Sequence, residues 1–174
     1  MPLIYITGPS GSGKTTLTQE LIARGYEAHD ADTRLCSWYN NETGEKAEYP
    51  TNTSLRTPDW QSRHSFLMSE TLLRELLQKS KGKTIFICGI APNDLQLAPK
   101  YFYKVLCLMI DEETMINRVT TRTNSKYGQA PDQLAIIQKW YQPTVEKYRE
   151  FGAVMIDATQ PIEKVIESIL AVIK

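Results

Sequence analysis

A glycine-rich stretch close to the start of the chain constrains the fold more than any other part of the sequence. Residues 8–15 read Gly-Pro-Ser-Gly-Ser-Gly-Lys-Thr and match the P-loop pattern G-x-x-x-x-G-K-[ST] at every position. The apolar run 3–6 before it is typical of a buried strand, and residues 16–24 after it place leucines at helical spacing. Strand, glycine loop and helix together direct backbone N–H groups and a helix N-terminus at a phosphate group. The stretch therefore predicts a nucleotide-binding site.

The residues of this loop have separate expected roles. Glycines let the backbone wrap around phosphate groups without a clashing Cβ atom. We expect the Lys14 ammonium to reach the β- and γ-phosphate oxygens, the Thr15 hydroxyl to ligate Mg²⁺, and Thr16 to contact the α-phosphate. Nucleotide contacts are expected along the whole loop and the first helical turn: Gly8, Ser10, Gly11, Ser12, Gly13, Lys14, Thr15 and Thr16.

Length and charge limit the classes of protein that the chain can represent. Its 174 residues suit one domain, 1–174, with one core. Because 20 basic and 20 acidic residues cancel, no overall basic field favours nucleic acid or an anionic membrane as a partner. The three cysteines show no C-x-x-C spacing. Because the first predicted strand begins at residue 3, we expect no signal peptide. No apolar run reaches membrane-spanning length, so we expect a cytoplasmic protein.

Apolar runs that alternate with helical patterns predict the fold. Five runs are typical of buried strands: residues 3–6, 26–32, 84–88, 104–110 and 153–156. Their alternation with helices predicts a five-stranded parallel α/β sheet with helices on both faces. Right-handed crossovers then bring the carboxyl ends of all strands to the P-loop side. Residues that follow strands are therefore expected to share one cleft: Asp30, Asp32, Gly89 to Asn93, Asp111 and Asp157 to Gln160.

Several elements between these strands are also expected. Residues 38–39 and 48–49 flank the turn 40–44 and predict a small hairpin. One amphipathic helix is expected from Thr57-Pro58 to a glycine-terminated end near residue 82. Farther along, a loop is expected after Gly89. Pro143 is expected to kink or split the helix that contains it.

Two carboxylates end the second predicted strand, which we expect to lie beside the P-loop. Asp30 and Asp32 can divide two tasks: one holds Mg²⁺ through its water shell, and the other orients a substrate hydroxyl or accepts its proton. Phosphoryl transfer needs little more from a base, because positioning and charge neutralisation supply most of the rate. The alternative is that both are solvated loop acids or a helix N-cap. The neighbouring P-loop favours the catalytic interpretation.

Two arginines suggest a lid. Arg118 and Arg122 are four residues apart and share one face of a predicted helix. Guanidinium groups can stack on adenine, clamp phosphates and stabilise the charge on a γ-phosphoryl group in transfer. With the polar run that follows, they predict a lid over about 118–130 that closes over ATP, with Gly128 as a hinge. A solvated helix face is the alternative.

The most apolar predicted strand, 84–88, has no acidic residue at its carboxyl end. It therefore lacks a conventional Walker B aspartate, and the chain has no N-K-x-D-like segment for reading guanine. Both observations count against motor-type ATPases and GTPase-like switches. They also assign the metal-holding role to Asp30.

An insertion over about 33–60 is expected across the cleft from ATP. Trp38, Arg56 and Arg63 lie in or next to it and could bind an acceptor that has a ring and a negative group. Equally, the aromatic residues could pack the insertion against the body of the domain. The sequence leaves both possibilities open.

The P-loop, the D-x-D segment and the arginine-bearing lid together resemble the small P-loop kinases of the nucleoside monophosphate kinase superfamily. Residues 29–33, His-Asp-Ala-Asp-Thr, resemble the D-x-D segment of shikimate and gluconate kinases, which phosphorylate hydroxyls of small molecules. Residues 121–128 also look like a group of small kinase-like ATPases. The resemblance implies that Asp30 serves Mg²⁺ and that Asp32 contacts the acceptor hydroxyl.

The same resemblance implies roles for the other end of the cleft. Arg118 and Arg122 become lid arginines, and the loop 157–161, with Thr159, borders adenine. Shikimate kinases have a run of glycines after the central strand, whereas residues 89–93 here read Gly-Ile-Ala-Pro-Asn. Gly89 and Asn93 in this segment are our candidates for acceptor contacts.

These observations favour an ATP- and Mg²⁺-dependent phosphotransferase that acts on a small-molecule acceptor. Within this class, a nucleoside or nucleoside monophosphate competes with a sugar-like or polyol acceptor. An ATPase that depends on a macromolecular partner is the alternative from another class. A kinase of nucleic-acid ends is disfavoured by the zero net charge. We expect a monomer or a homodimer.

Overall fold

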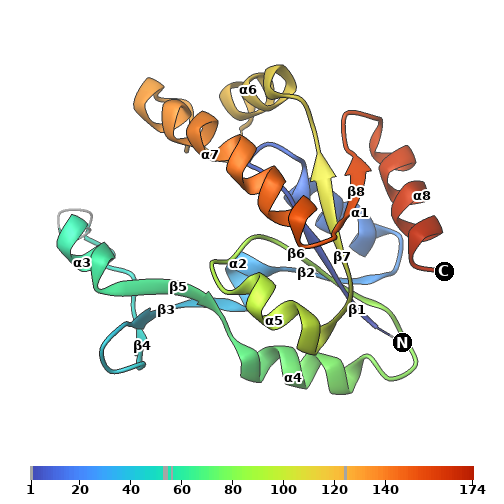
Figure 1. Ribbon diagram of the computed structural model, residues 1–174, viewed down its shortest axis with the longest axis horizontal. Coiled ribbons are helices and arrows are strands. Elements are labelled where there is room, and N and C mark those ends of the chain that lie inside the picture. The colour runs from blue at the N-terminus through green and yellow to red at the C-terminus, as the bar shows by residue number, and fades with distance from the viewer. Residues whose placement is uncertain (1, 53–54, 56, 124) are drawn as a thin grey trace.

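The computed structural model describes residues 2–52, 55, 57–123 and 125–174. Its main sheet has five parallel strands in the order β2-β6-β1-β7-β8 (Figure 1). The strands are β1 (Leu3–Thr7), β2 (Glu27–Asp30), β6 (Ile85–Cys88), β7 (Phe102–Met109) and β8 (Val154–Asp157). The predicted parallel α/β sheet is therefore confirmed.

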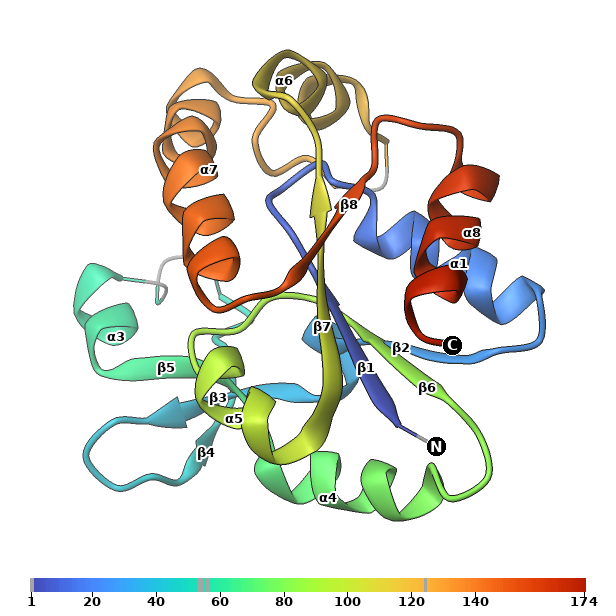
Figure 2. The same cartoon turned by 45° about the vertical axis from the view of Figure 1, so that its right-hand side comes forward.

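Helices cover both faces of this sheet, which explains why its central strands are mostly apolar. Leucines of α1 (Lys14–Ala23) and the valine and isoleucines of α8 (Ile162–Val172) share one buried cluster with alternate residues of the strands, on the right in Figure 2. The helices α4 (Glu70–Lys79) and α5 (Asp94–Tyr101) cover the other face. All five residues of β1 are fully buried, as expected for a strand covered on both faces.

Two helices connect β7 with β8. The helix α6 (Glu112–Thr121) begins after β7, and Asp111 caps it by accepting a hydrogen bond from the Thr114 backbone N–H at 2.7 Å. The helix α7 (Pro131–Glu150) leads back to β8. Pro143, expected to kink or split this helix, does not split it. In the described part of the chain, no helix has both the length and the apolar character needed to cross a membrane.

A second, three-stranded antiparallel sheet in the order β4-β3-β5 stands away from the main sheet. It consists of β3 (Cys36–Asn40), β4 (Lys46–Ala47) and β5 (His64–Met68), with α3 (Pro58–Ser62) at its far end (Figures 1 and 2). We call residues 36–68 the arm. It is joined to β2 by α2 (Ala31–Arg34). The predicted hairpin is confirmed, but its second strand is two residues earlier than expected.

The segments around the arm differ from the predictions in two ways. The helix expected from residue 57 to 82 is divided into α3, β5 and α4, because Phe66 and its neighbours pair with β3 instead. Long-range strand pairing overrides the helical spacing of the leucines there. The loop expected after Gly89 is present over residues 89–93, but α5, which was not expected, follows it from Asp94; its internal Pro99 obscures the helical pattern.

Candidate active site

The P-loop connects β1 to α1 and packs tightly against its surroundings. A Cβ atom on Gly8, whose φ is +146°, would lie 2.6 Å from the Leu108 carbonyl oxygen of β7. Gly13 is the N-cap of α1 and has a φ of +96°, a conformation that favours glycine. The loop can therefore direct the first N–H groups of α1 outward as an anion-binding cradle.

The Lys14 ammonium lies inside this cradle. It donates hydrogen bonds to the carbonyl oxygens of Gly8 (2.7 Å) and Pro9 (2.9 Å). Burial lowers the pKa of Lys14 to about 8, while the nearby Asp32 carboxylate acts in the opposite direction. A phosphate group in the loop would restore the full positive charge, because a negative neighbour favours the protonated amine.

The two aspartates come close to Lys14, although not by the expected route. The strand β6 lies between β1 and β2, so the expectation that Asp30 and Asp32 follow the strand next to β1 is wrong. They reach the site across the end of β6, where a Cβ atom on Gly89 would lie 2.5 Å from the Ala31 Cβ. Because Gly89 has no Cβ atom, α2 can pack closely over the end of β6. Both carboxylates raise the pKa of Lys14, with Asp32 the stronger influence.

The geometry distinguishes the two aspartates. Asp30 is the N-cap of α2: its Oδ1 accepts the backbone N–H of Asp32 at 3.0 Å and that of Thr33 at 3.3 Å. Asp30 is therefore a helix N-cap, as the alternative interpretation of the sequence predicted. Only its Oδ1 takes part in capping, so Oδ2 can serve as a metal ligand. The Asp32 side chain is exposed at the mouth of the site. Partial desolvation, followed by the charge of Asp30, raises its pKa.

Oxygen donors suited to Mg²⁺ occur at this position. The Thr15 hydroxyl lies exposed in the first turn of α1, and Asp30 has the second oxygen of its carboxylate. Mg²⁺ usually takes one or two carboxylates together with water and substrate phosphates. Among the described residues, no group of three or more His, Cys, Asp and Glu side chains could hold a metal ion. Thr15 and Asp30 fit a metal held jointly with a nucleotide.

The residues expected on the adenine side come together. The Arg118 Nη1 of α6 donates a hydrogen bond to the Ala158 carbonyl oxygen at 3.0 Å, in the loop after β8. Thr159 in that loop is held by Asp157 Oδ1, which accepts its backbone N–H at 2.9 Å and its hydroxyl at 2.6 Å. The side chain of Arg118 therefore lies against the loop predicted to border adenine.

The predicted lid is closely packed at two places, the C-terminus of α6 and Gly128. Arg122 caps the C-terminus of α6, and its Nη2 donates a hydrogen bond to the Tyr127 carbonyl oxygen at 2.6 Å. Gly128 is buried, and a Cβ atom there would lie 2.4 Å from Val119 Cγ1. Gly128 is therefore required for close packing. Its predicted hinge role stays a prediction.

The residues expected to contact the acceptor do not all lie near the P-loop. Trp38 lies in the arm, Arg63 pairs with the exposed Asp59 at the arm's far end, and Arg56 lies outside the described residues. The Asn93 side-chain amide accepts the Met68 backbone N–H (2.9 Å) and donates to the Met68 carbonyl oxygen (3.0 Å). Asn93 thus anchors the arm where β5 ends.

The arm has its own aromatic cluster. Trp38 stacks on Tyr49 with ring centroids 5.1 Å apart and planes at 10°, and it contacts Trp60 and Phe66 at 5.1 and 5.3 Å. Trp60 in turn stacks on His64 at 4.0 Å. Of the two possibilities left open by the sequence, the aromatic residues of the insertion pack mainly against one another.

A buried carboxylate that no sequence pattern singles out connects several elements of the fold by hydrogen bonds. Asp94 is fully buried at the start of α5, and its Oδ2 accepts hydrogen bonds from the hydroxyls of Tyr5 (2.9 Å) and Tyr148. Its Oδ1 accepts from the Lys147 ammonium at 3.1 Å. Burial and the Asp94 charge raise the pKa values of both tyrosines. Asp94 therefore links β1, which leads into the P-loop, with α7, which follows the lid.

Fold and site together define a P-loop protein of the parallel α/β class. The glycine-rich loop between β1 and α1 and the cradle around Lys14, at the edge of a parallel sheet, are the features that define this class. Residues 4–138 match the family described as AAA domain, and the chain belongs to that family. No curated protein matches the chain.

Solved structures of kinases share the fold. A gluconokinase from Sinorhizobium meliloti 1021 is 18% identical with a TM-score of 0.54, and the match covers 98% of this chain and 90% of that one. A deoxyadenosine kinase from M. mycoides with bound dATP is 16% identical (TM-score 0.58, 99% of both chains). A shikimate kinase from Acinetobacter baumannii in complex with shikimate is 24% identical (TM-score 0.58, 99% and 93%). At these identities the likeness establishes the fold.

Proposed function

We propose that the chain is an ATP-dependent phosphotransferase that moves the γ-phosphate of Mg-ATP to a hydroxyl or phosphate of a small molecule in the cytoplasm. One observation carries this proposal: the Lys14 ammonium is held inside the P-loop by the carbonyl oxygens of Gly8 and Pro9, and the nearby carboxylates of Asp32 and Asp30 raise its pKa. A phosphate-binding cation and a pair of carboxylates therefore share one site. Phosphoryl transfer needs this combination.

Each residue then has a role in transfer to a hydroxyl. The loop from Gly8 to Thr16 holds the phosphates, and Lys14 neutralises charge on the β- and γ-phosphates. Thr15 and Asp30 would hold Mg²⁺, which would neutralise negative charge on the phosphate groups when bound. Arg118, against the loop with Thr159, would flank adenine, and Arg122 lies one turn farther along α6.

Asp32 is the residue that we assign to the acceptor. The acceptor oxygen forms a bond to the γ-phosphorus while the bond from that phosphorus to the β–γ bridging oxygen breaks. The hydroxyl proton passes to Asp32, and the products are ADP and the phosphorylated acceptor. A raised pKa makes Asp32 a better proton acceptor than an ordinary aspartate.

The structural neighbours support a small-molecule acceptor. They include a gluconokinase, a shikimate kinase and a deoxyadenosine kinase, so this fold accommodates both hydroxylated small molecules and nucleosides. We propose a monomer or a homodimer as the active form.

The test is ADP formation from Mg-ATP with two acceptor panels, one of nucleosides and their monophosphates and one of sugars, polyols and hydroxy acids. We expect Lys14→Ala and Asp32→Asn each to lower kcat/KM by at least about 100-fold, because each removes a group that acts on the reacting atoms. Asp59→Asn, at the exposed far end of the arm, is the matched control and should leave the rate unchanged. Hydrolysis without any acceptor that Asp32→Asn leaves unaltered would contradict the proposal and indicate a partner-dependent ATPase.

A further inference from the structure

Two large apolar side chains of α7 lie exposed on the surface of the molecule. Ile136 is 48% exposed and Trp140 is 59% exposed. They are four residues apart, so they lie on the same side of the helix. Within the described residues, Trp140 has no aromatic partner, whereas Trp38 and Trp60 stack inside the arm.

A contact near the other end of α7 fixes the direction in which this face points. Lys147 follows Trp140 by seven residues, which is almost two helical turns, so both side chains leave α7 on nearly the same side. The Lys147 ammonium lies 3.1 Å from Asp94 Oδ1, just beyond the loop that follows β6. Ile90 in that loop is 38% exposed. The face with Trp140 is therefore turned toward the segment after β6.

The contact between Lys147 and Asp94 also fixes how far along the strand direction Trp140 lies. The helix rises about 10 Å from Lys147 back to Trp140. The strand β1 also rises about 10 Å from Tyr5, whose hydroxyl contacts Asp94, to Gly8 at the start of the P-loop. Because α7 returns from the lid toward β8, it runs against the direction of the parallel strands. Trp140 therefore lies at about the level of the P-loop.

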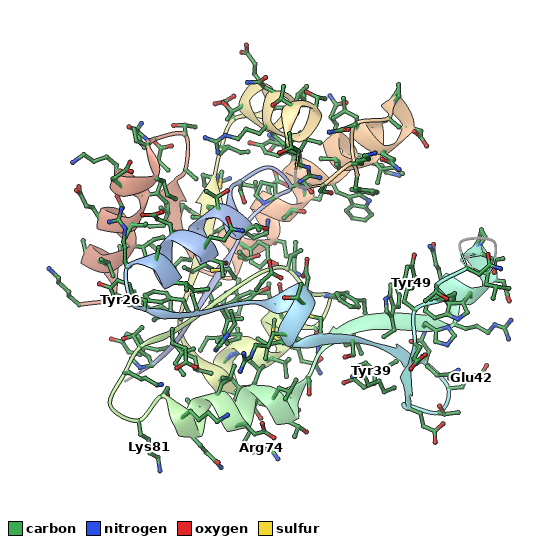
Figure 3. All side chains as sticks on the ribbon, turned by 180° about the vertical axis from the view of Figure 1, so that it is seen from behind. Tyr26, Tyr39, Glu42, Tyr49, Arg74 and Lys81 are labelled. Carbon is green, nitrogen blue, oxygen red and sulfur yellow. The ribbon has the colours of Figure 1, made fainter. Side chains whose placement is uncertain are left out.

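The arm presents a second aromatic surface on this side of the molecule. Figure 3 shows Tyr49 on the side of the arm that faces α7, and Tyr39 on the opposite side. Tyr49 stacks on Trp38, so the aromatic cluster of the arm also lies on the side of α7. The arm begins only four residues after Asp32. Aromatic surfaces of α7 and of the arm therefore border the position that we assign to the acceptor.

We infer that the phosphoryl acceptor carries an aromatic ring, such as a nucleobase, and that Trp140 with Ile136 forms a wall against which this ring packs. The inference rests on the proposed function and narrows its substrate class. Stacking of a base on an aromatic side chain contributes substantial binding energy and does not depend on one base, because every base has a π-face. A polyol has no flat face that would use such a wall.

The experiment compares KM values for the two acceptor panels in the wild type, Trp140→Ala and Trp140→Phe. We expect nucleosides to be the better acceptors and Trp140→Ala to raise their KM by at least about fivefold, with kcat and the KM for ATP nearly unchanged. Trp140→Phe, which keeps a ring, should restore most of the affinity. Tyr103→Ala is the matched control, because Tyr103 is 64% exposed near the start of β7, at the far end of the sheet.

Three results would overturn the inference while leaving the proposed function intact. These are a preference for polyols, equal KM values in the wild type and Trp140→Ala, and a Trp140→Ala variant that changes only the subunit number measured by light scattering. The last result would identify the face as a contact between copies of the chain. Calorimetric titration with adenosine and thymidine without ATP tests the wall even if no transfer occurs, because ring binding should then weaken in Trp140→Ala but not in Tyr103→Ala.

Discussion

The body of the molecule and its arm are held together in different ways. In the body, the strands of the main sheet are covered on both faces, and β1 is buried at every residue. In the arm, the strand residues are mostly half-buried and the contacts are between aromatic rings. A doubly covered sheet holds the P-loop and both aspartates at fixed positions. A small antiparallel sheet with its own cluster can differ in shape without disturbing that geometry.

Two adjacent residues stabilise different regions of the molecule. Asn93 holds the Met68 backbone, where the arm returns to the body, and Asp94 accepts hydrogen bonds from Tyr5 and Tyr148 inside the body. Substitutions in the two regions should therefore differ in how far their effects spread. A substitution in the body should lower the stability of the whole molecule, whereas a substitution in the arm should loosen the arm alone.

The largest effect is expected for Asp94→Ala. Its removal leaves buried hydroxyl groups of two tyrosines with fewer partners and breaks the contact with Lys147. We expect the free energy of unfolding to fall by about 3 kcal/mol, because buried polar groups without partners are costly. Urea denaturation followed by circular dichroism measures this change.

Lys147→Met is the control for Asp94→Ala. The Lys147 side chain is 40% exposed, so its pairing with Asp94 should contribute at most about 1 kcal/mol. Equal losses in the two variants would show that the ion pair, and not the tyrosine hydrogen bonds, carries the stabilisation. A loss confined to α5 in hydrogen exchange would contradict the global effect expected of the body.

A smaller and local effect is expected for Trp38→Ala in the arm. Trp38 contacts three other rings, and each aromatic pair contributes roughly 0.5–1.5 kcal/mol. We expect local opening of the arm to become easier by about 2 kcal/mol, measured by amide hydrogen exchange in β3 and β5. The urea midpoint of the body should hardly move.

Trp38→Phe keeps a ring and should restore most of the protection from exchange. An equal drop in protection across β1 and β3 in Trp38→Ala would break the distinction between the two regions. The arm would then fold only together with the body, and its aromatic cluster would belong to one continuous core.

The difference between the regions also explains what the sequence could predict. The P-loop, the alternation of strands and helices, and the cap at Asp111 depend on residues close in the chain, so local patterns sufficed. The closeness of Asp30 and Asp32 to Lys14 followed from the rule that carboxyl ends of parallel strands share one edge. The rule was sufficient even though β6, and not β2, is next to β1.

Long-range contacts account for the failures. β5 is a strand because it pairs with β3 across a segment of more than twenty residues, and nothing in its own spacing indicates this. Asp94 acquires its importance from Tyr5 and Tyr148, which lie 89 and 54 residues away in the chain. The exposure of Trp140 similarly depends on which side of α7 packs on the sheet. Single-sequence patterns do not encode these pairings.

The smallest effect that we predict concerns the protonation of Lys14 in the body. Its pKa of about 8 lies below the ordinary value for lysine because the ammonium is buried. Between pH 8 and the ordinary lysine pKa, the unfolded chain binds more protons than the folded one, so the stability of the free protein should rise with pH there. Nucleotide phosphates would restore the charge, so ATP binding at pH 8 should take up roughly half a proton.

Calorimetry of ATP binding in buffers of different ionisation enthalpy measures this uptake. It should decline toward zero as the pH falls to about 6.5, where Lys14 is already protonated, and it should vanish at pH 8 in Lys14→Met. The Trp38→Ala variant should show the same uptake as the wild type, because the arm does not contribute to the cradle around Lys14. An uptake that survives in Lys14→Met would assign the proton to another group, whereas an uptake that changes in Trp38→Ala would show that arm and body are coupled at the phosphate site.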